Sequence, residues 1–242
     1  MSEQNFGEGA LITFEGGDGS GKGTQTELLY QWLLSQGLPV RKGGFPMYKT
    51  PTGEKVAKYL NGDYGEELTA DEAGVLYQDD RLANIGPIRE WVERGGIQLL
   101  DRYVESNSGH QGGKLRTKEE RIAYILKNAE TEYGQNGLPE PDLTILFTLA
   151  PELAYEYVAR KTAASRADYT ELTHDIHENN KHHLADANEA FALLPELYPG
   201  RFAHTPITSE SGLEMLPKQE IHLAVQKAVR PLLLEKGYSI TD

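Results

Sequence analysis

The stretch FEGGDGSGKGTQ, which runs from Phe14 to Gln25, holds the residues best suited to chemistry on phosphate groups. Gly16, Gly21 and Lys22 fit the spacing G-x-x-x-x-G-K, in which backbone N–H groups turn inward around phosphate oxygens and the lysine adds a positive charge. A glycine-rich turn that only joined a strand to a helix would have no use for the lysine. We therefore expect this loop to bind nucleotide phosphates. The expected contacts come from Gly16, Gly19, Ser20, Gly21, Lys22, Gly23 and Thr24.

Gly23 occupies the position at which many phosphate loops carry the serine or threonine that binds Mg²⁺. The adjacent Thr24 can offer a hydroxyl group directly or through a water molecule, so we still expect Mg²⁺ at this loop. The sequence GKGTQ also resembles the loop of adenylate kinases, in which Gly-Thr follows the lysine. Gly23 therefore favours a nucleoside monophosphate kinase over a GTPase or a motor ATPase.

The segments around the loop alternate between strand-like and helix-like patterns, which predicts an α/β fold with a parallel sheet between helices. A buried strand at 10–14 precedes the loop, and a helix with Leu29, Trp32 and Leu33 on one face follows it. The other predicted strands lie within 38–46, 96–103, 141–151 and 201–207. The other predicted helices begin at the capping boxes 69–72 and 117–120, at Pro151 and at Ile221, and Gly86 and Pro87 should kink the first of these.

Composition and charge narrow the class of protein further. The chain has 242 residues, 38% of them hydrophobic, which is enough for a buried core, and we expect one domain over 1–242. Its formal net charge of −13 disfavours a nucleic-acid polymer as partner, because such partners need a basic surface. It has no cysteine, so disulfides, thiolate nucleophiles and cysteine metal sites are excluded. The polar start and the lack of an apolar run of roughly 18 residues predict a cytoplasmic protein without a membrane span.

Four strings together resemble the thymidylate kinase family. FEGGDGSGKGTQ, GGFP, DRYVESNSGHQGG and LPEPDL occur in the order and spacing of that family, and the resemblance runs from about Gly9 to about Leu234. It implies the P-loop nucleoside monophosphate kinase fold, a five-stranded parallel sheet flanked by helices with a mobile lid at about 160–175. It also implies a homodimer that uses ATP and Mg²⁺ to phosphorylate dTMP to dTDP.

The resemblance assigns roles at the phosphate end of the site. Asp18 matches a carboxylate near the 3′-hydroxyl group of the acceptor sugar, with a turn-stabilising aspartate as the alternative. Asp101 matches the ligand of Mg²⁺ or of its water, and Arg102 matches a guanidinium that bridges phosphates. A surface ion pair is the alternative for these two, but a strand that ends in Asp-Arg at the carboxyl edge of a sheet favours the site. The implied catalytic residues are Lys22, Asp18, Asp101, Arg102 and Arg166.

Other matched positions concern the base and sugar of dTMP. Tyr77 and Arg81 are spaced to share one helix face, so that the ring can stack on thymine while the guanidinium reaches a carbonyl oxygen. A tyrosine at helical spacing is often only part of the core, and this alternative stays open. Gly109 stands where the family has alanine, and we expect it to keep the pocket floor open and to loosen selectivity. The remaining implied contacts to dTMP are Phe45, Arg102, Tyr103, Ser106 and Gln111.

Two segments depart from the family pattern. The arginine that commonly follows Phe-Pro by two places and grips the acceptor phosphate is replaced by Tyr48, so we assign this contact to Lys49. The second departure is the histidine-rich segment 174–183. Its histidines are His174, His177, His182 and His183, with His204 more remote. Histidines on an exposed acidic helix are more often solvated than bound to metal, so we do not expect a metal site there.

A catalytic cation must come from outside the phosphate loop, because the loop position after GGDG is the uncharged Ser20. The implied lid carries Arg160, Lys161 and Arg166 in a polar segment. Arg160 is expected to contact the ATP phosphates or to neutralise a helix end, which leaves Arg166 as the first candidate for an arginine finger. Two other functions stay open. One is a kinase for another or a broader set of deoxynucleoside monophosphates, and the other is a nucleotide-binding sensor or scaffold that has lost turnover.

Overall fold

Five strands form a parallel sheet in the computed structural model, which describes residues 7–64, 68–149, 153, 156, 181–209, 211–212 and 214–241. The strands are β1 (Ala10–Gly16), β2 (Val40–Gly44), β3 (Ile97–Asp101), β4 (Leu143–Phe147) and β5 (Phe202–His204). They lie in the order β2-β3-β1-β4-β5, and every neighbouring pair is parallel. The predicted five-stranded parallel sheet is therefore confirmed.

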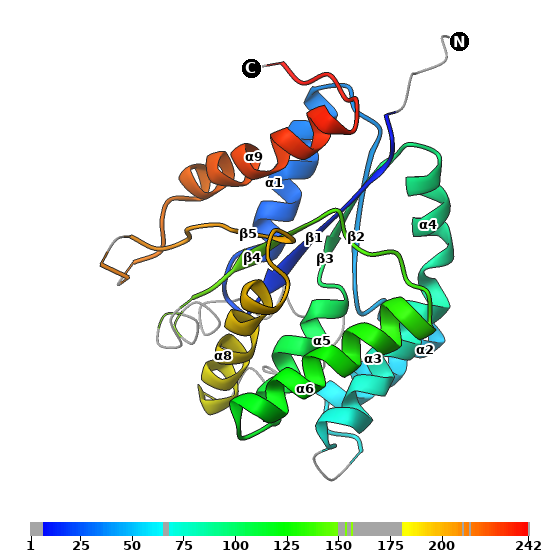
Figure 1. The fold of residues 1–242 in the computed structure, drawn as a ribbon, viewed down its shortest axis with the longest axis vertical. Helices are drawn as coiled ribbons and strands as arrows, with labels where there is room; N and C mark the ends of the chain where they lie inside the picture. The colour runs from blue at the N-terminus through cyan, green and yellow to red at the C-terminus, as the bar shows by residue number, and fades with distance from the viewer. Residues whose placement is uncertain are drawn as a thin grey trace.

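Helices cover both faces of this sheet. They are α1 (Lys22–Ser35), α2 (Pro51–Leu60), α3 (Ala70–Asn84), α4 (Gly86–Glu93), α5 (Val104–His110), α6 (Lys118–Ala129), α8 (Lys181–Leu197) and α9 (Lys218–Glu235), with a 3₁₀ turn at Gly112–Lys114 and a π-helical turn at Glu130–Gln135. Figure 1 shows α1 and α9 side by side on one side of the sheet, and α3, α5, α6 and α8 grouped on the other. No helix in the described part of the chain is both long and apolar enough to span a bilayer.

The central strand β1 explains why two layers of helices form. All of its residues are buried, and successive side chains point to opposite faces of the sheet. Ile12 and Phe14 belong to a hydrophobic cluster that also contains Val225 of α9, whereas Leu11 belongs to a second cluster with Ile88 of α4. A strand that is buried on both faces needs a layer of helices on each side, which fits the position of β1 at the centre of the sheet.

The strand register places the candidate chemistry at one edge of the sheet. Phe14 of β1 pairs with Asp101 of β3, and Gly16 pairs with Phe147 of β4. Because β1 continues into the phosphate loop and β3 continues into Arg102, their parallel pairing brings the loop and the Asp-Arg pair to the same carboxyl edge.

Helix boundaries agree with the sequence at the caps. Thr69 and Thr117 each form the predicted capping box with the glutamate three residues later. The predicted kink is instead a complete break between two helices, since α3 ends at Asn84 and α4 begins at Gly86. Pro87 in the first turn of α4 has no N–H group to continue the hydrogen-bond ladder of α3, which accounts for the break.

Other elements differ from the prediction. The last helix begins at Lys218 rather than at Ile221, and the helices α2 and α5 were not predicted. The helix predicted from Pro151 and the lid predicted at about 160–175 lie outside the described residues.

Candidate active site

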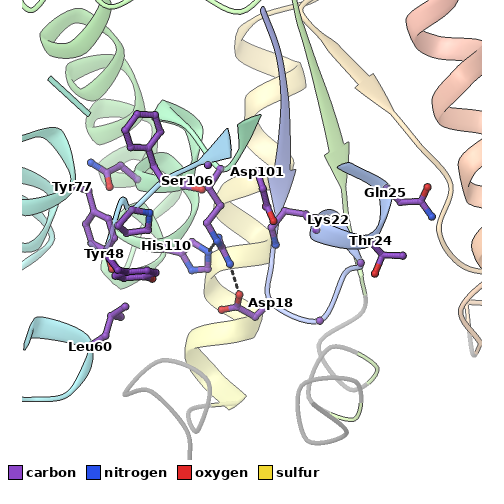
Figure 2. A pocket seen from close by; sticks show the side chains of 18 of the residues that line it. Asp18, Lys22, Thr24, Gln25, Tyr48, Leu60, Tyr77, Asp101, Ser106 and His110 are labelled. Atoms are coloured by element: carbon purple, nitrogen blue, oxygen red, sulfur yellow. Dashed lines mark hydrogen bonds and ion pairs between the residues drawn. The ribbon is translucent and has the colours of Figure 1, made fainter. Parts of the chain in front are cut away.

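A pocket of about 670 Å³ opens where the phosphate loop and the end of β3 meet. Its wall combines segments far apart in the sequence, namely the phosphate loop, the turn after β2, α3, α5 and the residues that lead into α9. In Figure 2, Tyr48 and Tyr77 lie at one end of the pocket, Thr24 lies toward the other, and Lys22 and Asp101 lie between them. The pocket therefore has two ends of different chemistry on either side of a charged centre.

The phosphate loop has the backbone geometry that its glycines predict. Gly16, Gly19 and Gly21 have φ angles of 134°, 80° and 88°, in the left-handed region that favours glycine. Lys22 is buried at the start of α1, and its Nζ atom donates a hydrogen bond of 2.7 Å to the carbonyl oxygen of Gly17. The loop thus folds around its own lysine between a strand and a helix, which is the context that the motif requires.

Gly23 brings the end of β3 close to the first turn of α1. A Cβ atom at this position would lie 3.0 Å from Oδ2 of Asp101, so a larger residue would crowd the carboxylate. The other oxygen of Asp101, Oδ1, is buried and has no hydrogen-bond partner within the described residues. Thr24 is exposed at the pocket wall nearby. An unpartnered carboxylate oxygen and a hydroxyl group are the kind of hard oxygen ligands that suit Mg²⁺.

Arg102 lies at the centre of the pocket in an unusual backbone conformation. Its φ angle is 69°, which non-glycine residues rarely adopt. Its guanidinium forms an ion pair with Asp18, drawn as a dashed line in Figure 2, and its NH1 atom lies 2.8 Å from Nε2 of His110. Burial lowers the pKa of Arg102, but the surrounding carboxylates, Asp18 and Asp101 foremost, raise it above its ordinary value overall. Arg102 is therefore a permanent cation.

The buried carboxyl group of Glu15 ties the phosphate loop to the segment after β3, and the sequence analysis gave it no role. The backbone N–H of Tyr103 donates to Oε1 and the hydroxyl of Ser106 donates to Oε2, each at 2.6 Å. Burial raises the pKa of Glu15 to about 7, and the nearby carboxylate of Glu105 adds to the rise, while the bond from Ser106 and the charge of Arg102 oppose it. The available sequence signal was a single charged residue, Glu15, in a strand that is otherwise uncharged.

Arg81, which is predicted to contact the base of dTMP, forms an ion pair with a buried carboxylate. Its Nε and NH2 atoms donate to the two carboxylate oxygens of Glu132, both at 2.6 Å, and its NH1 atom donates to the carbonyl oxygen of Tyr103 at 3.2 Å. Only 1% of Arg81 is exposed, although it lines the pocket together with Tyr77. The ring of Tyr77 meets that of Tyr59 edge-on, with ring centroids 6.3 Å apart. Arg81 therefore has a structural ion pair in addition to its place in the wall.

The other residues predicted to bind dTMP divide into two groups. Phe45, Ser106 and Gln111 line the pocket, and the buried Oε1 atom of Gln111 has no hydrogen-bond partner within the described chain. Tyr103 lies behind the wall, where it is fully buried and its hydroxyl donates to the carbonyl oxygen of Pro139 at 3.1 Å. Among the predicted phosphate contacts, Gly16 and Ser20 likewise lie behind the loop residues that form the wall.

The structure bears on two expectations about individual positions. Lys49 is exposed and lies outside the pocket wall, which Tyr48 lines, so its contact with the acceptor phosphate stays a prediction. Gly109 does not leave the pocket floor open, because the ring of Phe191 fills the space beside it. A Cβ atom on Gly109 would lie 2.2 Å from that ring.

The histidine-rich segment also differs from its expected solvated helix where it can be described. His183 is buried in α8, while His204 is exposed and bonded to Thr148 at 2.8 Å. In the part of the chain that the structure describes, no group of three or more His, Asp or Glu side chains is arranged to hold a metal ion. The side chains of Arg160, Arg166, His174, His177 and His182 lie outside the description.

Several residues of the wall were missed by the sequence analysis. They are Gly44, Pro46, Tyr48, Leu60, Asn107, His110, Met215, Leu216, Lys218 and Ile221, together with Gln25 of the loop. Met215 shows why, because it reaches the phosphate loop from a segment almost two hundred positions later, and its Cε atom would lie 3.8 Å from a Cβ atom on Gly21. No local pattern in the sequence signals such a contact.

Glu15→Gln should change how stability depends on pH. In the unfolded chain this carboxyl group loses its proton near its ordinary pKa of 4.5, but in the folded chain it keeps the proton until about pH 7. The folded state therefore binds more protons between these values, and the contribution of Glu15 to stability falls as pH rises from 5 to 8. The variant lacks this loss, so its unfolding free energy relative to the natural chain should rise over that range by on the order of 1 to 3 kcal/mol.

Urea unfolding at pH 5, 6, 7 and 8 measures this difference, with the exposed Glu93→Gln as the matched control. Parallel pH profiles for the Glu15 variant and the natural chain would show that the Glu15 carboxyl has an ordinary pKa.

Comparisons relate the chain to known proteins. The family described as Thymidylate kinase matches residues 14–194. A thymidylate kinase of an Exiguobacterium species is 36% identical over 224 residues, which cover 90% of this chain and 95% of the relative. A thymidylate kinase of Verminephrobacter eiseniae is 33% identical over 232 residues, which cover 95% and 93%.

A solved structure shows the same architecture. The thymidylate kinase of Candida albicans aligns with a TM-score of 0.70 and 21% sequence identity over 97% of this chain and 96% of that one, so the two share the P-loop nucleoside monophosphate kinase fold. The family match spans the phosphate loop, the Asp-Arg pair and the pocket helices α3 and α5. With the phosphate loop and the Asp-Arg pair in one pocket, these matches show that the chain belongs to the thymidylate kinase family.

Proposed function

We propose that this chain transfers the γ-phosphoryl group of ATP to the 5′-phosphate of dTMP, giving dTDP and ADP. The observation that carries the proposal is the pocket itself, which joins the phosphate loop and Lys22 to an end lined by aromatic and amide groups, with Arg102 in the wall. A donor at one end and an acceptor at the other would meet at the charged centre. Phosphoryl transfer needs alignment and charge neutralisation more than covalent help.

The phosphate loop would hold the triphosphate of ATP. Its inward N–H groups and the N-terminus of α1 favour negative charge, and Lys22 supplies a cation at the base of the loop. Oδ1 of Asp101 and the hydroxyl of Thr24 are the oxygens that would hold Mg²⁺, directly or through water. A bound Mg²⁺ would neutralise charge on the terminal phosphates.

Arg102 and Asp18 would align the acceptor. The guanidinium of Arg102 stays charged and can bridge phosphate oxygens in bidentate fashion, and Asp18 can accept a hydrogen bond from the 3′-hydroxyl group. Because the two side chains are paired with each other here, binding of dTMP would exchange part of this pair for contacts to the substrate. Their burial in one pocket favours that exchange over a purely surface ion pair.

The far end of the pocket suits a pyrimidine base. The ring of Tyr77, held edge-on by Tyr59, offers a face for stacking. The buried oxygen of Gln111 lacks a donor within the described residues, and the N3–H group of thymine would supply one. Arg81 lies in the same wall and would contact a carbonyl oxygen of the base with a donor that Glu132 does not occupy.

We extend the proposal to the overall organisation of the chain. It forms one domain over 1–242 with a lid at about 160–175, and because ATP and dTMP are cytoplasmic metabolites we expect a cytoplasmic enzyme. Arg160 and Arg166 of the lid would reach the ATP phosphates, with Arg166 as the catalytic cation, because Ser20 leaves the phosphate loop without one.

We also propose a homodimer formed through the outer faces of α3 and α6. These helices are neighbours, since Lys127 of α6 pairs with Asp71 of α3 at 2.8 Å. Val75 and Leu82 of α3 are 49% and 46% exposed, and Leu126 of α6 is 48% exposed. Apolar side chains on adjacent exposed helices are the usual material of a protein–protein interface.

The first test measures diphosphate formation with ATP and each of dTMP, dUMP, dCMP, dGMP and dAMP. We expect dTMP to have the highest kcat/KM, and Lys22→Met to abolish turnover while its circular dichroism stays normal.

The Candida albicans enzyme is described as having broad substrate specificity, and Tyr48 replaces the expected acceptor arginine here, so equal rates on several monophosphates would indicate the broader kinase instead. No turnover with any of them would support the sensor or scaffold.

A second test concerns the lid. If Arg166 acts as an arginine finger, Arg166→Ala should lower kcat by on the order of 10³ or more with little change in ATP affinity, because the contact forms mainly in the transition state. Single-turnover kinetics and ATP titration measure the two quantities. Loss of ATP affinity with normal kcat would reduce Arg166 to a binding residue and move the catalytic role to Arg160 or Lys161.

A third test concerns the dimer. Leu82→Glu places a charge on the proposed interface, so light scattering after gel filtration should show a monomer where the natural chain is a dimer. Leu223→Glu is the matched control, since Leu223 is an exposed leucine of α9, away from α3 and α6. A dimer mass for the Leu82→Glu variant would place the interface elsewhere.

A further inference from the structure

His110 makes a hydrogen bond whose direction fixes its protonation state. It is the last residue of α5, it is buried, and it lines the pocket. Its Nε2 atom lies 2.8 Å from NH1 of Arg102. A guanidinium group can only donate hydrogen bonds, so Nε2 must be the acceptor. The ring proton then lies on Nδ1, and the imidazole is neutral in this contact.

Helix α8 fixes the orientation of this imidazole ring. His183 of α8 stacks on it, with ring centroids 5.8 Å apart and an angle of 20° between the rings. Phe191, also on α8, meets it edge-on at 5.5 Å and 89°. Gly109 makes this possible, because any side chain there would collide with Phe191. These two contacts fix the plane of the ring, and the hydrogen bond to Arg102 selects the flip state in which Nε2 faces the guanidinium.

Two acceptors from different parts of the chain therefore hold the guanidinium of Arg102. Asp18 of the phosphate loop takes NH2, and His110 takes NH1. An arginine side chain that is free to rotate loses rotamer entropy when it is ordered, and fixed acceptors reduce that loss at the moment of binding. Once the sugar of the acceptor occupies Asp18, the hydrogen bond to His110 still holds NH1 of Arg102.

We propose that His110 is a positioning residue, which orients the guanidinium of Arg102 toward the transferring phosphoryl group. Helix α8 in turn holds the ring of His110 through His183 and Phe191. The inference rests on the proposed function, since it takes Arg102 to be the group that bridges the phosphates. His110 itself touches neither reacting atom in this arrangement and acts through Arg102.

Two substitutions distinguish the contribution of the acceptor nitrogen from that of the aromatic ring. His110→Phe keeps an aromatic ring for the contacts with His183 and Phe191 but has no acceptor, whereas His110→Gln keeps an acceptor oxygen. His110→Phe should lower kcat roughly 10- to 100-fold with little change in KM for ATP, because a hydrogen bond to a charged group is lost. His110→Gln should recover most of this loss. Equal losses in both variants, or normal kcat in His110→Phe, would overturn the proposal.

A double-mutant cycle shows whether the effect passes through Arg102. In an Arg102→Ala background, His110→Phe should cause no further loss of kcat, because the side chain that it positions is gone. Losses that multiply independently would mean that His110 acts by another route. His204→Gln is the matched control, since His204 is exposed and is not part of the pocket wall, and its kcat should be that of the natural chain.

Nitrogen NMR of the His110 ring tests the geometry without any turnover. Nε2 should give the signal of an unprotonated acceptor nitrogen and Nδ1 that of a protonated one, and Arg102→Ala should shift the Nε2 signal. A protonated Nε2 in the natural chain would overturn the inference. If the natural chain turns over none of the monophosphates, the proposed function fails, and this spectrum still decides whether His110 holds Arg102.

Discussion

The carboxyl group of Glu15 is the link on which the arrangement of the pocket depends. At the end of β1 it accepts hydrogen bonds from the backbone N–H of Tyr103 and from the hydroxyl of Ser106. The phosphate loop and the start of α5 therefore cannot move apart without leaving buried polar groups unpaired. The segment held in this way contains Arg102, and through it the pairing with Asp18 and His110. A single buried acid thus sets the distance between the part of the site that would hold the donor and the part that would align the acceptor.

The local charge of the pocket differs from the charge of the whole chain. The net charge is −13, yet the described wall brings together more cations than carboxylates. The cations are Lys22, Arg102 and Lys218, together with Arg81, whose charge Glu132 balances from behind the wall, and the carboxylates are Asp18 and Asp101. An acidic exterior repels long polyanions, whereas a cationic cleft concentrates small ones. The contrast explains how a protein unsuited to nucleic-acid polymers can still bind their monomeric precursors.

Short sequence patterns correctly predicted the features that neighbouring residues determine. These are the phosphate loop, the capped helix starts and the strands. Of the two missed helices, α2 has a readable start in Thr50 followed by Pro51, whereas every residue of α5 is buried and no amphipathic period marks it. The site contacts that the sequence did not reveal depend on partners far along the chain. Glu132 binds Arg81 from 51 residues away, and Phe191 fills the space beside Gly109. Such contacts are settled by packing, which single-sequence patterns do not encode.

The backbone of Arg102 has a consequence for engineering this protein. It is the one non-glycine residue in the described ranges with a positive φ, a conformation that costs on the order of 1 kcal/mol or more for a residue with a side chain. Glycine would adopt it without that cost. Glycine would, however, also remove the ion pair with Asp18 and the hydrogen bond to His110, and hydrogen bonds to charged groups contribute roughly 1.5–3 kcal/mol each. Relief of backbone strain, a common route to heat-resistant variants, therefore fails at this peptide unit, because the strained residue makes the contacts that hold the pocket together.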